Sequence, residues 1–269
     1  MENALVLGTS HTQDYIDFKE VCADYNPVGE QRWVEYFCEK VHRHIIKRCS
    51  GSLGIETYAP RVLSVKEDYN IALIEIPSCG RYEIWIKTKS QKNKQFMLTE
   101  KFWENPMTKK TGLLWFWVSG PGSGDLALGK GTLTKIKNVN TNATSHLQVN
   151  DFKSYMNVKT LEDDNTQHDR IYANVHMLDG YFKSKNVVPI WFSWNFPPSK
   201  YDWTEINLVN SQCKNQSLEA HCNRILKWDL DSKEYVADGV HLNRKHWKTL
   251  VDLYFVEYTK KILGKVDDK

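Results

Sequence analysis

Two short segments of the 269-residue chain contain residue types that together support nucleophilic catalysis by a hydroxyl group. Ser10 follows a short apolar run, and Asp238 and His241 lie three positions apart in the last part of the sequence. An aspartate and a histidine at this spacing in a loop can place the carboxylate on Nδ1 of the imidazole, while Nε2 faces a serine. The pattern predicts Ser10 as nucleophile, His241 as general base and acid, and Asp238 as the residue that orients His241.

The elements expected around these residues would bring the three side chains together. Residues 3–8 are a short apolar run that ends in a glycine, as a buried strand does where it passes into a loop. Ligand sites of open α/β sheets gather at the carboxyl ends of the strands, and Ser10 would lie at such an end. Asn243 is suited to cap a last helix, which places His241 in the loop before that helix. The residues that this helix would bury are Trp247, Leu250, Val251, Tyr254 and Tyr258.

Further apolar segments indicate the fold class. Residues 71–77 and 187–194 are short apolar runs typical of buried strands. Residues 30–47 and 164–185 repeat apolar residues at helical spacing. Strands that alternate with helices in this way favour an α/β fold with a mostly parallel central sheet.

The middle of the chain has a different character. Residues 84–160 contain strand-like runs separated by stretches rich in Lys, Asn and Thr, with little helical periodicity. Within them, residues 124–132 approach the phosphate-loop pattern, but Gly131 stands where a hydroxyl is needed and a strand-like segment follows. We therefore predict a glycine-rich hairpin there and no nucleotide site. Residues 84–160 are interpreted as a large insertion within a single domain of residues 1–269.

The first and last segments resemble sequence blocks of the SGNH (GDSL-type) hydrolases, a family of serine esterases. The family's first block, Gly-Asp-Ser at the end of the first strand, reads Gly-Thr-Ser at residues 8–10. Its last block, Asp-x-x-His ahead of the C-terminal helix, matches residues 238–241. The resemblance covers about residues 1–83 and 187–263, and it implies a flavodoxin-like three-layer fold and ester hydrolysis.

The resemblance also implies an oxyanion hole, and here the chain departs from the family. Gly54 lies in a segment that matches the family's second block, and it would donate its backbone N–H together with that of Ser10. Cys79 stands where the third block, Gly-x-Asn-Asp, has its asparagine, and a thiol is a weaker donor than an amide. Asn195, at the end of the expected third strand, is a candidate substitute for this amide.

Three residues are candidates for substrate binding. His11 follows the expected nucleophile and is interpreted as a hydrogen-bonding residue of the pocket wall. Asn195 would lie at a strand end on the same sheet, and Arg81 could hold an anionic substrate group or pair with Glu83. An arginine and a glutamate after the second strand resemble divergent SGNH-like proteins of phages.

The function that these residues imply is a serine-dependent esterase or deacylase acting on an O-acyl ester, such as an acetylated carbohydrate. The alternative is a non-catalytic SGNH-like module, a glycan-binding or viral scaffold protein, and Cys79 favours this alternative. The single residues also have structural alternatives: Ser10 as a loop cap, Asp238 as a helix cap and His241 as a half-buried loop histidine. Five tryptophans in or near apolar runs could stack on a sugar ring or pack in the hydrophobic core. They are Trp115, Trp117, Trp191, Trp194 and Trp203.

Composition excludes several other classes. Lys and Arg total 36 against 33 Asp and Glu, a net charge of +3 that gives no footprint of a nucleic-acid binder. No apolar run approaches the ~18 residues of a membrane span, and the N-terminus does not resemble a signal peptide, so we expect a cytoplasmic protein, or a virion-associated one if it is viral. Six cysteines form no CxxC pair, and Cys213, His221 and Cys222 match no zinc pattern. We expect a small-molecule or glycan ester as substrate, and neither metal nor cofactor.

Overall fold

A computed structural model of the chain describes residues 2–13, 30–49, 55, 58–63, 65–77, 82–87, 113–118, 164–196, 201–232, 234–236 and 241–267. The chain separates into two compact units. The first comprises residues 1–51, 67–78 and 175–269, and the second comprises residues 52–66 and 79–174.

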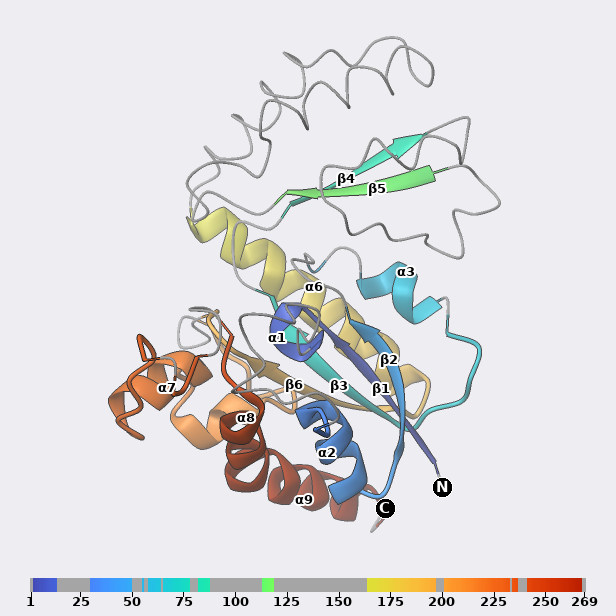
Figure 1. Cartoon of the computed structure of the whole chain (residues 1–269). Helices are drawn as coiled ribbons and strands as arrows, with labels where there is room; N and C mark the ends of the chain where they lie inside the picture. Colours follow the sequence, from blue (N-terminus) through green and yellow to red (C-terminus); the bar gives the residue numbers. More distant parts are fainter. Residues whose placement is uncertain are drawn as a thin grey trace, which may run out of the picture. The chain divides into compact units, whose positions relative to one another are not determined.

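A four-stranded parallel sheet forms the centre of the first unit (Figure 1). Its strands are β1 (Asn3–Gly8), β2 (His44–Cys49), β3 (Ile71–Ile76) and β6 (Val188–Ser193), in the spatial order β2-β1-β3-β6. All three pairs of neighbouring strands are parallel. This order, with the first strand between the second and the third, is that of flavodoxin-like folds. The predicted α/β class with a parallel central sheet is confirmed.

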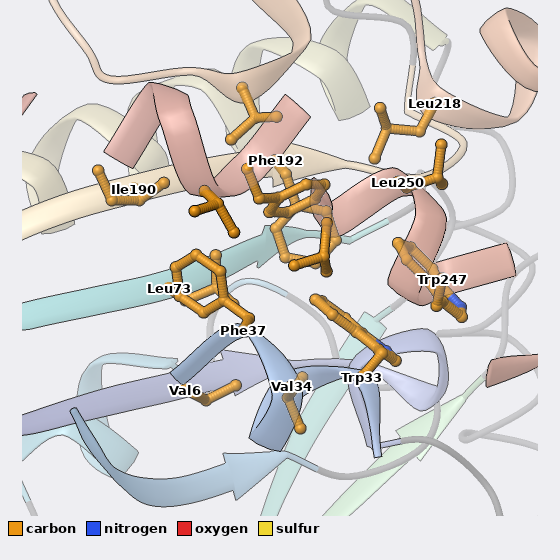
Figure 2. Close-up of a cluster of buried hydrophobic side chains, with 14 of the residues drawn as sticks. Val6, Trp33, Val34, Phe37, Leu73, Ile190, Phe192, Leu218, Trp247 and Leu250 are labelled. Atoms are coloured by element: carbon orange, nitrogen blue, oxygen red, sulfur yellow. The ribbon is translucent and has the colours of Figure 1, made fainter. Parts of the chain in front are cut away.

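One face of the sheet is covered by helices from both ends of the chain (Figure 2). They are α2 (Trp33–Lys40), α8 (Arg244–Leu250), the π-helical turn η6 (Val251–Phe255) and α9 (Val256–Asp267). Their apolar side chains pack on alternate residues of the strands, because successive strand residues point to opposite faces. The strand residues of this core are Ala4, Val6, Ile71, Leu73, Ile190 and Phe192.

The opposite face of the sheet packs against α6 (Asp164–Ser184). Trp191 lies between two strand residues of the first core, so its side chain points to this other face, where Nε1 donates to Oδ1 of Asp179 at 2.9 Å. Val175, Leu178 and Phe182 of α6 are buried, as the helical spacing predicts. Helices on both faces of the sheet give three layers.

The helix expected over residues 30–47 is wrong in its second half. The helix α2 ends at Lys40, and the chain then turns and continues as β2. His42 has a φ of 55°, a left-handed conformation that a continuing helix excludes. The apolar residues at 45 and 46 are both isoleucines, which suit a strand because they are β-branched. Ile45 thus lies at helical spacing from the apolar residues of α2 by chance, and it belongs to β2.

The cap predicted for the last helix is confirmed. The side chain of Asn243 accepts a hydrogen bond from the backbone N–H of His246 at 3.1 Å and caps α8. The predicted apolar face is largely correct, with Trp247, Leu250 and Val251 buried in the core. Before α8, the short helices η5 (Val209–Cys213) and α7 (Leu218–Arg224) follow β6.

The second unit contains α3 (Tyr58–Leu63) and an antiparallel pair of strands, β4 (Tyr82–Lys87) and β5 (Leu113–Val118). Both strands lie where strand-like runs are expected. The glycine-rich segment at 124–132 and most of the expected insertion lie outside the described residues. Within the part of the chain that is described, no helix is long and apolar enough to cross a membrane.

Candidate active site

The turn between β1 and α1 (Ser10–Gln13) carries the expected nucleophile at the carboxyl end of a central strand. Gly8 ends β1, and Thr9 joins the strand to the helix. A Cβ atom at position 8 would overlap the side chain of Thr12. The first turn of α1 can therefore pack this closely against the end of β1 only if residue 8 is a glycine. This close approach explains why a glycine precedes the Thr-Ser pair.

A buried carboxylate from the neighbouring strand fixes this turn. Glu75 of β3 is 1% exposed and accepts hydrogen bonds from Thr9 and Thr12. The backbone nitrogen of Thr9 donates to Oε2 at 2.8 Å, and the Thr9 hydroxyl donates to Oε1 at 2.6 Å. The Thr12 hydroxyl and backbone nitrogen both donate to Oε2, at 2.5 Å and 3.3 Å. Donors on both sides of Ser10 are thus bound to one side chain.

An aromatic stack supports the same turn from the helical layer. Trp33 donates its indole N–H to the backbone oxygen of His11 at 2.9 Å. The Trp33 ring is stacked on Trp247, with centroids 4.5 Å apart and planes 12° apart (Figure 2). Trp247 contacts Trp194 at 5.1 Å, and Trp194 contacts the His11 ring at 5.3 Å. The stack connects α2, α8 and the end of β6 to the histidine beside Ser10.

The ring of His241 packs against the ring of His11. Their centroids are 4.8 Å apart and the planes are tilted by 51°. His11 is 3% exposed, whereas His241 is half-buried. The first and last sequence segments, predicted to form one site, therefore meet at these two imidazoles.

The segment that carries His241 is attached to the chain just before it. Val236 and Leu242 form an antiparallel bridge, and the Asn243 N–H donates to the Tyr235 oxygen at 2.8 Å. The side-chain amide of Asn243 also donates to the backbone oxygen of Glu234. Asn243 therefore both caps α8 and holds the segment on which His241 lies.

A pocket of about 600 Å³ opens beside His11. Its walls come from the residues after β6, from α7 and from the chain that follows α7. Asn195, a predicted substrate-binding residue, lies in this wall, as does the buried Trp194. The remaining lining residues are Glu219, Ala220, Asn223, Arg224, Leu230, Asp231 and Val236.

The polar residues of α7 are the part of the site that the sequence does not reveal. Glu219, Asn223 and Arg224 face the pocket, but they belong to no motif and occur in a segment without a strong apolar pattern. The backbone N–H of Glu219 donates to the oxygen of Trp194 at 2.9 Å, which attaches the start of α7 to the pocket. Partial removal of the Glu219 carboxylate from water raises its pKa above the ordinary value, although the residue stays exposed at the pocket wall.

Several predicted site residues cannot be compared with the structure. Asp238, Gly54, Cys79 and Arg81 lie outside the described residues, and for Ser10 only the backbone is described. Of the tryptophans considered for sugar stacking, Trp191, Trp194 and Trp203 are buried core residues, and Trp115 and Trp117 lie on β5, without described side chains.

The cysteine and histidine cluster on and before α7 has no metal-site geometry. Cys213 and Cys222 are free, buried thiols, and burial raises the pKa of each to about 12. His221 Nε2 lies 2.7 Å from the Tyr254 hydroxyl. Across the described ranges, no group of three or more His, Cys, Asp or Glu side chains could hold a metal ion.

The fold and the site together define an α/β protein with a mostly polar pocket, lined in part by His11, at the carboxyl ends of β1 and β6. Comparison of the chain with protein-family models, with curated proteins and with solved structures finds no match.

Proposed function

We propose that the chain is a serine-dependent esterase in which Ser10 is the nucleophile and His241 the general base. The observation that carries this proposal is the contact between the rings of His241 and His11, the residue that follows Ser10. A base must come within hydrogen-bond reach of the nucleophile, and apo enzymes often hold this pair more loosely than reacting complexes do. The packing of His241 against the neighbour of Ser10 brings the proposed base to the carboxyl end of β1, and this supports the assignment.

The proposed reaction has two steps. Ser10 Oγ attacks the acyl carbon while His241 takes the hydroxyl proton, and the same proton then passes to the leaving alcohol. A water molecule, deprotonated by His241, next attacks the acyl-serine, the bond between Oγ and the acyl carbon breaks, and His241 returns the proton to Ser10 Oγ as the carboxylic acid is released. Asp238, three residues before His241, is proposed to orient the imidazole through Nδ1.

The oxyanion that forms on the acyl group needs hydrogen-bond donors. The amides of Thr9 and Thr12 are bound to Glu75. The Ser10 amide is proposed as the donor of the first segment. Gly54 is proposed as the second donor, with Cys79 as a weak third. Loss of one donor costs about 10²–10³ in rate, so Cys79→Asn should raise the Ser10-dependent rate of ester hydrolysis. An unchanged rate would point to Asn195, which lines the pocket, as the donor already present.

The pocket lining favours a short acyl group on a polar alcohol. Most of its side chains are polar or charged, and they include Glu219, Arg224 and Asp231. A long acyl chain would bury apolar surface against carboxylates and a guanidinium without gain in hydrogen bonding. Sugar hydroxyls would instead exchange hydrogen bonds with these groups, so an acetylated carbohydrate is the substrate type that we propose.

The test is hydrolysis of p-nitrophenyl acetate by wild type and by Ser10→Ala. We expect slow turnover by wild type and loss of this turnover in the variant. Ser184→Ala, at the end of α6 and exposed, is the matched control and should behave as wild type. Equal hydrolysis by wild type and Ser10→Ala, also across acetylated sugars, would overturn the esterase and favour the non-catalytic glycan-binding module.

A further inference from the structure

We infer that Glu75 is the positioning residue for the nucleophile: it holds the β1–α1 turn in the conformation that presents Ser10. The inference rests on the proposed esterase function and deepens it. It concerns a residue that belongs to none of the sequence segments of the site. Glu75 lies on β3, which is the neighbour of β1 in the sheet.

The contacts of Glu75 are directed to the two residues that flank the start of α1. Thr9 lies before Ser10 and Thr12 lies after His11, and each donates a backbone N–H and a hydroxyl to the Glu75 carboxylate. Neither threonine can shift without breaking its hydrogen bonds to a side chain that is itself buried. Ser10 and His11 are therefore held between two fixed points.

Because the Glu75 carboxylate is buried, the loss of its hydrogen bonds would be costly. A carboxylate away from water needs hydrogen bonds to its oxygens, and buried N–H groups need acceptors in turn. Here Oε2 accepts three of the hydrogen bonds and Oε1 accepts one. Hydroxyl groups can reverse their role, but the two backbone N–H groups can only donate. Removal of the Glu75 side chain would leave both amides unsatisfied and free the turn to rearrange.

Nucleophilic attack by a serine depends on the exact position of its hydroxyl, so the hydrogen bonds from Thr9 and Thr12 to Glu75 matter for the rate. A misplacement of about 1 Å can cost about 10²-fold in rate, because the attacking oxygen must be aligned with the acyl carbon and with the base. Side chains fixed by buried hydrogen bonds to a rigid strand supply that alignment better than a loop alone. Trp33 of α2, through its hydrogen bond to the His11 oxygen, also holds this turn.

The experiment compares Glu75→Ala and Glu75→Gln with Asp179→Ala. Asp179 is a matched control, because it is a buried carboxylate in the same unit that binds Trp191 and Lys183 on the opposite face of the sheet. For each protein we would measure the rate at which a fluorophosphonate labels Ser10, the Tm, and hydrogen–deuterium exchange of the peptide that contains residues 9–13.

Glu75→Ala should slow labelling by about 10²-fold and speed exchange in the turn. Glu75→Gln should recover most of both, since its amide oxygen can accept from the two backbone N–H groups while its NH₂ donates to a threonine hydroxyl. Asp179→Ala should lower the Tm and leave labelling and exchange of residues 9–13 as in wild type. If Glu75→Ala does not fold, Thr12→Val, which removes one hydroxyl at constant shape, should show the same changes to a smaller degree.

The possible failures are distinguishable. Labelling and exchange in Glu75→Ala equal to those of wild type would overturn the positioning role and leave the esterase intact. Equal losses of labelling in Glu75→Ala and Asp179→Ala would also overturn it, because a general loss of stability would then explain both. Absence of labelling in wild type, with faster exchange of residues 9–13 in Glu75→Ala, would overturn the esterase. It would still support Glu75 as the residue that holds the β1–α1 turn in place.

Discussion

The imidazoles of His11 and His241 lie with their centroids 4.8 Å apart, although they come from opposite ends of the chain. The carboxyl ends of the parallel strands lie at one edge of the sheet, and ring contacts join the residues that follow them. His11, after β1, contacts Trp194, after β6, and it also contacts His241 in the segment before α8. The aromatic stack from Trp33 to Trp194 then fixes His11 at the position where His241 can reach it.

The two histidines should differ in their importance for activity. We predict that His241→Ala lowers the rate of p-nitrophenyl acetate hydrolysis by about 10²–10⁴, the contribution of a general base. His11→Phe should remain within about tenfold of wild type, because a phenyl ring keeps the packing against Trp194 and His241. His44→Ala, at an exposed position on β2, is the control. A larger loss in His11→Phe than in His241→Ala would assign the base to His11.

Two glycine substitutions should have opposite effects on stability. Gly8→Ala introduces a Cβ that overlaps Thr12, and we expect a loss of about 1–3 kcal/mol in the free energy of unfolding. Gly180→Ala adds a methyl group to open space on α6. It should raise the free energy of unfolding by about 0.5–1 kcal/mol, because alanine has less backbone freedom to lose on folding than glycine has. Urea denaturation of both variants measures these differences. Equal stabilities would show that the turn adapts to a side chain at position 8.

Sequence patterns predicted the strands well and the pocket poorly, for physical reasons. Fully buried strands such as β1 and β3 are continuous apolar runs, and Asn243 carries a local capping signal, so both are readable in the sequence. Glu75 interrupts an apolar strand, and only the sheet register shows which residues it meets. The site roles of Ser10 and His241 stay predictions from local sequence patterns, whereas the polar residues of α7 reach the pocket only through the tertiary fold.

Stability should decrease in mild acid because of buried histidines. Burial lowers the pKa of His246 and of His221 below the ordinary value of 6.5. The unfolded chain therefore binds protons more readily than the folded one, so the stability contributed by the neutral histidines is full above pH 6.5 and is lost as the pH falls below it. We predict that the Tm drops between pH 7.5 and pH 5.5.

His246 can be tested separately. Its ring packs against Trp228 and Tyr235, and Nδ1 lies 2.6 Å from Oδ1 of Asn243. His246→Phe keeps the ring packing but cannot titrate, so its Tm should change less with pH than that of wild type. His44→Ala should retain the wild-type pH dependence. The same pH dependence in His246→Phe and wild type would show that other groups control acid stability.

The pocket wall should select the substrate by polarity. We predict that kcat/KM for p-nitrophenyl acetate exceeds that for the octanoate ester by at least about tenfold. Arg224→Ala should lower kcat/KM for an acetylated sugar by about tenfold, through loss of a charged hydrogen-bond donor, with a smaller effect on p-nitrophenyl acetate. Lys260→Ala, exposed on α9, serves as the control. A preference for octanoate would contradict a polar substrate.

Whether Ser10 is an activated nucleophile is measured by peptide mapping after the folded protein is labelled with a fluorophosphonate. Only a serine with a nearby base reacts rapidly with this probe. We predict one labelled peptide, which contains Ser10, with loss of the label in Ser10→Ala and strong reduction in His241→Ala. Rapid labelling at another serine, or no labelling of the folded wild-type protein, would contradict it.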